Sequence, residues 1–547
     1  MKYIFLAAAL LIIFAALAIS ATTHQSATCD EVAHHIPVGY VLLTKWDFKM
    51  DTSQPPLSRY IIALPLKIFM KIKMPEDKNE WRRPDRSSFG RDFFYKYNHD
   101  PKKMVLICRI PVIIIGVLCG LLLFIWASSI YGNKAGLLSL FLYCLSPTIL
   151  AHAGLATTDM IATFFIFLSA YTFWMFLKDI CVKRMVFAGI SLGLAQLSKY
   201  NAILLYPVFL LFLVFEFRTI TKTKVGMLLK RFLIVILLSV ITAWAGYGFD
   251  FQPLLKDAMR AEEKIAVVHD VISRLPAYFS NMHPEKFLLQ TPIPLGSHIL
   301  GILGVFQHSS AGHSTFFWGE WSDKSNALYF LISFLIKNPI PMIILIVIGL
   351  FILVKRGIGR AERMILIIAA SFFIAASFSG LQIGIRHILP IYPFCLMVAG
   401  TSEKLLKKRN LNLIVVLLLM WQLYSALATW PNYIGYFNES VGRTKNGYKI
   451  LRDSNIDWGQ DLPALADYMS KSGKDEVVLY YFGQADPCAY GIKYKEFSGA
   501  ELIKPENKIY AISAQYLEGV VWTKDHEPTA LAGSSILIYD FSKRNAK

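Results

Sequence analysis

Residues Met104–Ser128 read MVLICRIPVIIIGVLCGLLLFIWAS, an apolar run with one charged side chain, Arg109. A run of this length is typical of a membrane-spanning helix, because about 20 helical residues cross a hydrocarbon core of about 30 Å. Similar runs recur along the chain, which has 547 residues, 55% of them hydrophobic and 17% charged. The sequence therefore predicts an α-helical polytopic membrane protein.

The apolar runs predict about eleven transmembrane helices when the chain is scanned in windows of about 19 residues. Lys199 divides one long apolar stretch into two of these spans. The predicted spans lie near Tyr3–Ser20, Met104–Ser128, Lys134–Leu150, Ala156–Leu177, Met185–Ser198, Ala202–Phe217, Phe232–Tyr247, Ile336–Val354, Met364–Gly380, Ile385–Gly400 and Leu411–Ala428.

The charges in the short loops predict the orientation. Alternate loops contain many Lys and Arg residues, whereas the intervening loops Ala151–Leu155 and Gly380–Gly384 contain none. Basic loops stay in the cytoplasm, so the N-terminus is predicted to be cytoplasmic and the C-terminus extracytoplasmic, whether the first run is a retained span, which we favour, or a cleaved signal peptide. The formal charge of +18 then reflects topology and not nucleic-acid binding. The basic loops are Lys178–Arg184, Arg218–Arg231, Lys355–Arg363 and Glu403–Asn410.

Three hydrophilic regions are predicted on the outer side of the membrane. Loops 21–103 and 248–335 belong to a membrane domain at residues 1–428, and residues 429–547 form a small C-terminal domain. β-branched and aromatic residues predict strands in that domain, so its expected class is α/β. The expected elements are a helix at Leu462–Lys471 and strands at Val477–Phe482, Lys508–Ser513 and Ser535–Phe541.

Two adjacent carboxylates, Asp30 and Glu31, follow the first apolar run. Ionisable groups beside lipid are costly and mark candidate functional sites. In a helix, Asp30 would share a face with His34, and Glu31 with His35. Carboxylate and imidazole at this spacing suit a general base or part of a metal site. The alternative is a helix start at which acidic residues stabilise the dipole.

A second carboxylate and several cations are predicted at the same membrane level. Asp159 begins a span, where it either caps the helix or serves as a second acid of the site. Snorkelling to the headgroups explains any one of the cations, but several cations around an acidic centre suit a phosphate-bearing lipid. The cations are Arg109, Lys199 and the pair Arg386 and His387.

The run Asp453-Ser454-Asn455-Ile456-Asp457-Trp458-Gly459-Gln460-Asp461 is a candidate binding loop. Its acidic, amide and indole groups are those that bind sugar hydroxyls and sugar faces. We predict that the loop binds a sugar or the molecule that accepts it, through Asp453, Asn455, Asp457, Trp458 and Gln460. The alternative is a linker rich in Asx turns. The run lacks the EF-hand spacing for calcium.

The order of these motifs resembles glycosyltransferase family 39, the dolichyl-phosphate-mannose-protein mannosyltransferase type with its bacterial members, and more distantly the aminoarabinose transferases that modify lipid A. The motifs are Asp30-Glu31, Pro55-Pro56-Leu57, His152 to Asp159, Gly319-Glu320-Trp321, Lys337-Asn338-Pro339 and Arg386-His387-Ile388-Leu389-Pro390. Two departures are Gln54 in place of a His and Gly442-Arg443-Thr444 in place of a second glycine after Val441.

The resemblance implies a GT-C fold in the bacterial plasma (inner) membrane and transfer of a sugar, by family default mannose, from a polyprenyl-phosphate donor. The acceptor is a hydroxyl of a protein, a lipid or a glycan, and the anomeric centre is inverted. Asp30 would be the general base, and Glu31 would orient the acceptor or pair with a cation. Arg386, with Lys199, Arg109 and His387, would neutralise the phosphate, and Asp159 would be a second acid. The sequence requires no cofactor, although His34 and Glu31 leave a divalent metal open.

A polytopic transporter or lipid flippase is the rival function. Transporters place ionisable residues near the membrane midplane and often show repeated halves. In this sequence the ionisable residues gather at one side, together with the large hydrophilic regions. That distribution favours an enzyme.

Overall fold

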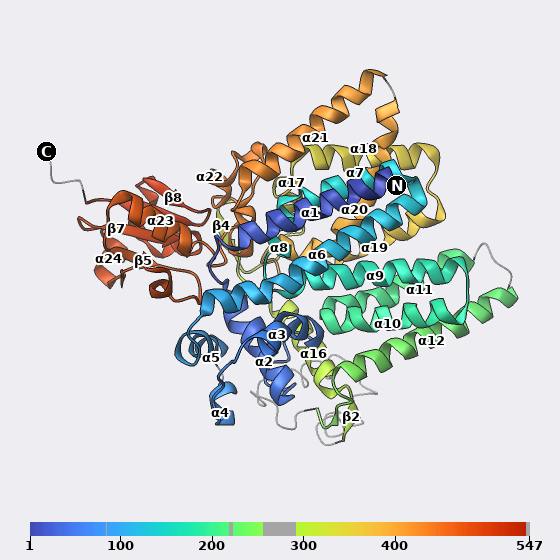
Figure 1. Cartoon of the computed structure of the whole chain (residues 1–547), viewed down its shortest axis with the longest axis horizontal. Helices are drawn as coiled ribbons and strands as arrows, with labels where there is room; N and C mark the ends of the chain where they lie inside the picture. The colour runs from blue at the N-terminus through green and yellow to red at the C-terminus, as the bar shows by residue number, and fades with distance from the viewer. Residues whose placement is uncertain (84, 218–221, 255–290, 408, 543–547) are drawn as a thin grey trace.

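The computed structural model describes residues 1–83, 85–217, 222–254, 291–407 and 409–542. Helices form a bundle, and the C-terminal residues form a separate layer at the end of the bundle away from the N-terminus (Figure 1). Parts of four predicted loops, at residues 84, 218–221, 255–290 and 408, lie outside the described residues.

Five of the described helices are long and apolar enough to cross a membrane: α1 (Lys2–Thr22), α6 (Pro101–Tyr131), α9 (Thr158–Lys178), α12 (Lys222–Gly246) and α21 (Arg409–Thr429). Two bent pairs raise this number to seven if each is one span. They are α7 (Asn133–Cys144) with α8 (Pro147–Ala153), bent by 66°, and α17 (Tyr329–Ile336) with α18 (Ile340–Arg356), bent by 114°. The helical membrane fold is confirmed, and the count of about eleven stays a prediction.

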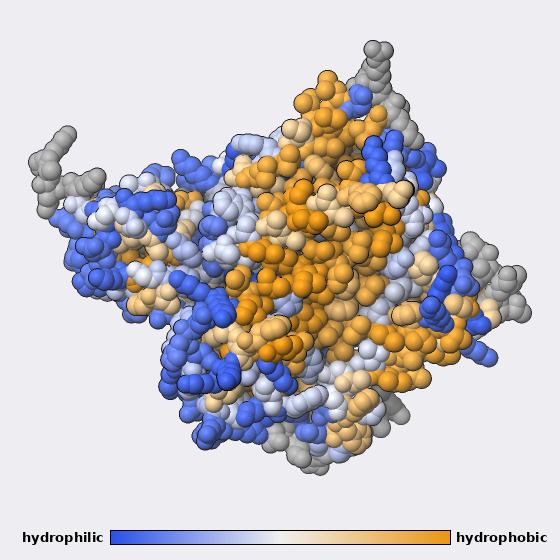
Figure 2. Space-filling view, viewed as in Figure 1, coloured by the Kyte–Doolittle hydropathy of each residue, from blue (hydrophilic) through white to orange (hydrophobic). Residues whose placement is uncertain are grey.

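Shorter helices occupy the other predicted spans: α10 (Val182–Ser198), α11 (Leu205–Phe217), α19 (Arg360–Ser377) and α20 (Tyr392–Gly400). Apolar side chains cover the middle of the bundle surface, and hydrophilic side chains cover the end that carries the C-terminal layer (Figure 2). This apolar surface is what a bilayer requires of a spanning bundle.

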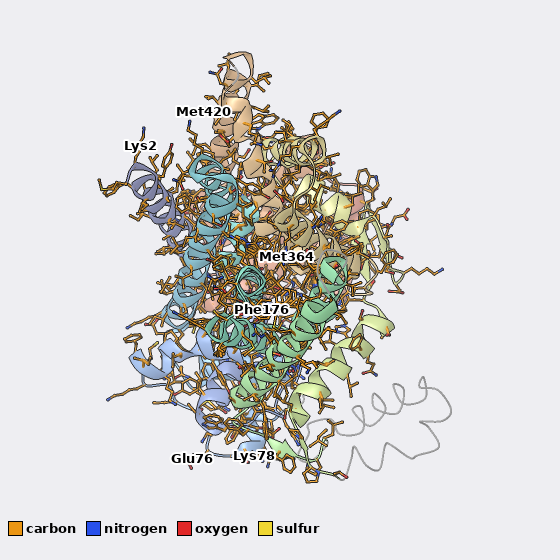
Figure 3. All side chains as sticks on the ribbon, turned by 90° about the vertical axis from the view of Figure 1, so that its right-hand side faces the viewer. Lys2, Glu76, Lys78, Phe176, Met364 and Met420 are labelled. Carbon is orange, nitrogen blue, oxygen red and sulfur yellow. The ribbon has the colours of Figure 1, made fainter. Side chains whose placement is uncertain are left out.

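Small residues bring helices close together inside the bundle. A Cβ atom added at Gly189 or Gly193 of α10 would lie 2.5 Å from the side chain of Leu238 or Thr242 of α12. Without those Cβ atoms the two backbones approach closely, as is common between membrane helices. Phe176 of α9 lies within the bundle and is fully buried (Figure 3).

Short elements on the side of the predicted outer loops connect the membrane helices. The first loop holds a π-helical turn (Glu31–His35), α2 (Ile36–Lys45), α3 (Pro56–Phe69), α4 (Lys78–Trp81) and α5 (Arg86–Arg91). The second holds α16 (Gly296–Ala311) and two antiparallel strand pairs, β1 (Phe251–Gln252) with β2 (Ile293–Pro294) and β3 (Thr315–Phe317) with β4 (Glu320–Ser322).

The C-terminal residues form a five-stranded sheet in the order β6-β5-β7-β9-β8. β5 is parallel to β6 and β7, and the other pairs are antiparallel. The predicted strands and helix are present as β5 (Val477–Tyr480), β7 (Ile509–Ser513), β9 (Ile536–Asp540) and α23 (Leu462–Ser472). The edge strands β6 (Tyr494–Glu496) and β8 (Ala530–Ala532) and the short helices α22 (Thr444–Gly447) and α24 (Gly499–Ile503) escaped prediction because they are three to five residues long. The domain boundary at residue 429 stays a prediction.

Candidate active site

Glu31, the first residue of the π-helical turn, forms a buried ion pair with Arg109 of α6. Both carboxylate oxygens of Glu31 accept from the Arg109 guanidinium, at 2.8 and 2.7 Å. The backbone amides of Thr28 and Ala156 also donate to Glu31, at 2.8 and 2.7 Å. The predicted pairing of Glu31 with a cation is therefore present in the structure.

Arg109 has no donor left for a phosphate. Its remaining N–H groups point to the backbone carbonyls of Thr22, Gln25 and Ser26, so that the guanidinium makes five hydrogen bonds, which is its full capacity. Its side chain is 1% exposed. The predicted phosphate role of Arg109 is wrong, because this cation is committed to holding Glu31 and the chain after α1.

Asp30 faces Arg386 across the predicted outer side of the bundle. Nη1 of Arg386 lies 2.8 Å from Oδ2 of Asp30, and both side chains are partly exposed. Burial raises the pKa of Asp30, but the charges of Arg386, His34 and His35 outweigh it and lower the pKa to about 2. The Asp30 carboxylate is therefore ionised at neutral pH and remains reachable.

The loop Asp453–Asp461 holds Arg386 and Asp30 in place. The guanidinium carbon of Arg386 lies 4.3 Å from the centre of the Trp458 ring, a cation–π distance. The Asn455 side chain accepts from the amide of Ile385 at 2.9 Å, and the carbonyl of Trp458 accepts from the amide of Cys29 at 2.9 Å. The loop therefore bonds to Cys29, which precedes Asp30, and to Ile385, which precedes Arg386.

Most side chains of the loop Asp453–Asp461 are buried, which corrects their predicted role in binding sugar. Asn455, Asp457, Trp458 and Gln460 are at most 2% exposed. Their polar groups bond within the protein: the Asp457 carboxylate, for example, accepts from the amides of Gly459 and Gln515. Asp453 is partly exposed and close enough to Asp30 and Arg386 to interact with their charges. A sugar role remains a prediction for Asp453.

Asp159 and Lys199 form a second pair, with Nζ of Lys199 2.6 Å from Oδ1 of Asp159. Asp159 is the second residue of α9, and Thr157 occupies the N-cap position. The predicted alternative that Asp159 caps the helix is therefore wrong, because its side chain contacts Lys199. Lys199 directly follows α10 and has an extended backbone. His387 lies close enough to Lys199, Arg386, Asp159 and Asp30 to interact with their charges.

His34 and His35 lie in the π-helical turn, and both are close enough to Asp30 for their charges to lower its pKa. Nδ1 of His34 also lies 3.8 Å from Asp51, a buried carboxylate that contacts Arg59 at 2.7 Å and Arg86 at 3.3 Å. The sequence does not predict this network, because Asp51 is not at a helical spacing from His34.

A metal at His34 and Glu31 does not fit these residues. The Glu31 oxygens already accept from Arg109, Thr28 and Ala156, and the described residues contain no group of three or more His, Cys, Asp and Glu side chains that could hold a metal ion.

Several buried polar atoms around Arg386 and Asp159 lack a hydrogen-bond partner in the described part of the chain. Buried polar atoms are bonded in the great majority of cases, so such a concentration marks where a polar ligand would bind. The atoms come from four separate segments: His35 Nδ1, His152 Nδ1, Asp159 Oδ2, Arg386 Nε and His387 Nε2.

Comparisons with known proteins find similar solved structures. The structure is similar to ArnT from Cupriavidus metallidurans bound to undecaprenyl phosphate, with a TM-score of 0.48, 10% identity and coverage of 98% of this chain and 97% of that chain. It is similar to the oligosaccharyltransferase AglB from Archaeoglobus fulgidus in complex with an inhibitory peptide and a dolichol-phosphate, with a TM-score of 0.44, 15% identity and coverage of 78% and 55%. The protein O-mannosyltransferase Pmt1-Pmt2 complex of S. cerevisiae gives a TM-score of 0.34, 13% identity and coverage of 48% and 37%.

No curated protein sequence matches the chain. Residues 103–244 match the family model described as dolichyl-phosphate-mannose-protein mannosyltransferase. This segment contains Asp159, Lys199 and His152 of the site. The matched residues include one of the motifs that resemble glycosyltransferase family 39, the segment from His152 to Asp159.

Proposed function

We propose that the protein is an integral membrane glycosyltransferase that moves a sugar from a polyprenyl-phosphate donor to a hydroxyl acceptor and inverts the anomeric centre. The observation that carries this proposal is the contact of Asp30 with Arg386 at 2.8 Å, an ionised carboxylate beside a cation in a partly exposed site. The family match, whose description contains such a donor, supports it. The proposed site faces the extracytoplasmic side, at headgroup depth.

In the proposed reaction, Asp30 takes the proton of the acceptor hydroxyl. The acceptor oxygen forms a bond to the anomeric carbon as the bond from that carbon to the phosphate oxygen breaks, and polyprenyl phosphate leaves. The transition state has oxocarbenium character, so charge neutralisation of the leaving phosphate lowers the barrier. Arg386 and Lys199 supply that charge, and His387 lies beside them.

Donor binding would also activate the base. In the free protein Arg386 lowers the pKa of Asp30. A phosphate that draws the Arg386 guanidinium to itself weakens this contact, and the pKa of Asp30 then rises towards the working pH, where a general base is most effective. The pair therefore couples occupation of the phosphate site to the readiness of the base.

The sugar is proposed to be mannose, the default of the matched family. The acceptor is a hydroxyl of a protein, a lipid or a glycan, and Asp453 is the residue of the C-terminal loop placed to meet it, because it is partly exposed near Asp30. No step in this reaction requires a metal or a cofactor.

The test is sugar transfer by membranes that contain the protein and a labelled polyprenyl-phosphate mannose. Asp30→Asn should lower transfer by about 10²–10⁴-fold, the usual contribution of a general base, with donor binding retained. Arg386→Ala should abolish transfer, with normal membrane insertion. The matched control is Asp467→Asn on α23, whose carboxylate is exposed. Undiminished transfer by Asp30→Asn would refute the base, and solute transport without any glycosyl product would favour the transporter.

A further inference from the structure

A cavity of about 220 Å³ lies where α21 ends and the C-terminal layer begins. It is separate from the candidate active site, since none of the residues assigned to that site lines it. Its walls combine aromatic, cationic and acidic side chains, among them Tyr424, Trp430, Tyr436, Glu439, Arg443 and Lys445.

The cavity lies at the level where the membrane helices end. Trp430 directly follows α21, which ends at Thr429, and its indole donates to the hydroxyl of Ser20 at 2.9 Å, near the end of α1. Tryptophan and tyrosine side chains are enriched at the membrane–water interface. The cavity is therefore at headgroup depth on the same side as Asp30.

An exposed apolar stripe on α21 leads to this cavity. Its members are spaced alternately by four and three residues, which places them on one face of the helix. Met420 is 59% exposed and lies at the periphery of the bundle (Figure 3), whereas Gln422 and Ser425 face inward and are buried. The stripe consists of Leu413, Leu417, Met420, Tyr424 and Leu427.

A cation lies at the end of the stripe. The Arg443 guanidinium donates to the Tyr424 hydroxyl at 3.2 Å, and half of the Arg443 side chain remains exposed. Lys445 is exposed beside it in the cavity wall. A phosphate at this position would meet two positive charges and would be followed directly by an apolar track.

Glu439 adds an acceptor that the protein leaves without a donor. Its Oε1 atom accepts from the Trp421 indole at 3.2 Å and from Arg443 at 3.4 Å. Its Oε2 atom is buried and has no hydrogen-bond partner among the described residues. An unbonded buried carboxylate oxygen is costly, so a ligand that binds here should donate a hydrogen bond to it.

We propose that this cavity binds a membrane phospholipid with a phosphoethanolamine headgroup. The phosphate contacts Arg443 and Lys445, the ammonium donates to Oε2 of Glu439, and the acyl chains follow the stripe on α21. The cavity is smaller than the roughly 300 Å³ at which pockets for drug-sized ligands begin, so it takes the headgroup and leaves the chains on the helix surface. Phosphocholine has no N–H to donate, and phosphoglycerol has no cation for Glu439.

The test is native mass spectrometry of the full-length protein in detergent with dioctanoyl phospholipids. Unmodified protein should retain one phosphatidylethanolamine about tenfold more tightly than phosphatidylcholine or phosphatidylglycerol, as expected for one charge-assisted hydrogen bond. Soluble phosphoethanolamine should bind at least about tenfold more weakly than the lipid, because it cannot use the stripe. Equal retention of the three lipids would overturn the headgroup, and equal binding of soluble phosphoethanolamine would overturn the lipid.

Variants assign the contacts. Glu439→Gln should abolish the preference for phosphatidylethanolamine over phosphatidylglycerol, and Arg443→Gln with Lys445→Gln should weaken both lipids by about tenfold or more. The matched control is Lys449→Gln, because Lys449 is an exposed cation nearby that pairs with Glu527 outside the cavity wall. Unchanged lipid retention in the double variant would refute the site. The lipid series on unmodified protein decides the question if a variant fails to fold.

Discussion

The Arg386 guanidinium lies against the Trp458 ring, 4.3 Å from its centre, and donates to Asp30 at 2.8 Å. A residue of the C-terminal region therefore fixes the cation that faces the proposed base. The same loop bonds to Cys29, next to Asp30, and to Ile385, next to Arg386. Trp458 is thus a positioning residue: it acts through Arg386.

Replacement of Trp458 should impair transfer through Arg386. A desolvated cation–π contact contributes about 2 kcal/mol, so Trp458→Ala should lower kcat/KM for the donor roughly 30-fold. Trp458→Phe keeps an aromatic face and should remain within about fivefold of the unmodified protein. The measurement is steady-state transfer with the donor varied.

A purely structural role for Trp458 predicts another pattern. Loss of packing alone would lower the fraction of active protein and leave the donor KM unchanged. Trp458→Phe would then restore transfer only as far as it restores the stability of the protein. Thermal unfolding of the three proteins, measured beside the kinetics, separates the two explanations.

Arg109 should matter for stability and not for the donor. Removal of one partner of a buried ion pair costs about 3–5 kcal/mol, so Arg109→Met should strongly lower the free energy of unfolding. Arg109→Met combined with Glu31→Gln should recover part of it, because Gln is neutral and keeps an acceptor for the amides of Thr28 and Ala156. The folded fraction of Arg109→Met should have a normal donor KM. A raised KM would restore the phosphate role that the hydrogen bonds exclude.

The two cations Arg109 and Arg386 show what the sequence could and could not predict. Apolar length predicted the helical fold, and composition predicted the three main strands, because those signals are local. Both arginines follow the same rule of a cation at headgroup depth, yet Arg109 is enclosed by Glu31 and three backbone carbonyls. Only the fold shows which cation has all its hydrogen bonds satisfied. The composition of the loop Asp453–Asp461 likewise predicts a binding loop from local sequence. Its contacts to Cys29, Ile385 and Arg386 are distant in sequence and are visible only in the fold.

Lys199 should serve both Asp159 and the donor phosphate. Lys199→Met leaves Asp159 buried without its partner, so both stability and transfer should fall, transfer by at least about tenfold. Asp159→Asn combined with Lys199→Met removes the unpaired charge and should restore the unfolding temperature without restoring transfer. If the double variant regains full transfer, Lys199 serves only to neutralise Asp159.

Asp457 should make the protein less stable as the pH rises. Burial, together with the charge of Asp461, raises the pKa of Asp457 from 3.8 to about 7. Between about pH 4 and pH 7 the folded protein therefore holds a proton that the unfolded chain has released. Stability falls with rising pH in that window, by at most roughly 1.4 kcal/mol per pH unit, and levels off above it.

Asp457→Asn removes this titration and should flatten the dependence of the unfolding temperature on pH between 5 and 7.5. The exposed control Asp467→Asn should keep the slope of the unmodified protein. An equal slope in Asp457→Asn would show that Asp457 is ionised in the fold. In that case the loop would hold Trp458 against Arg386 around a buried negative charge instead of a neutral carboxyl group.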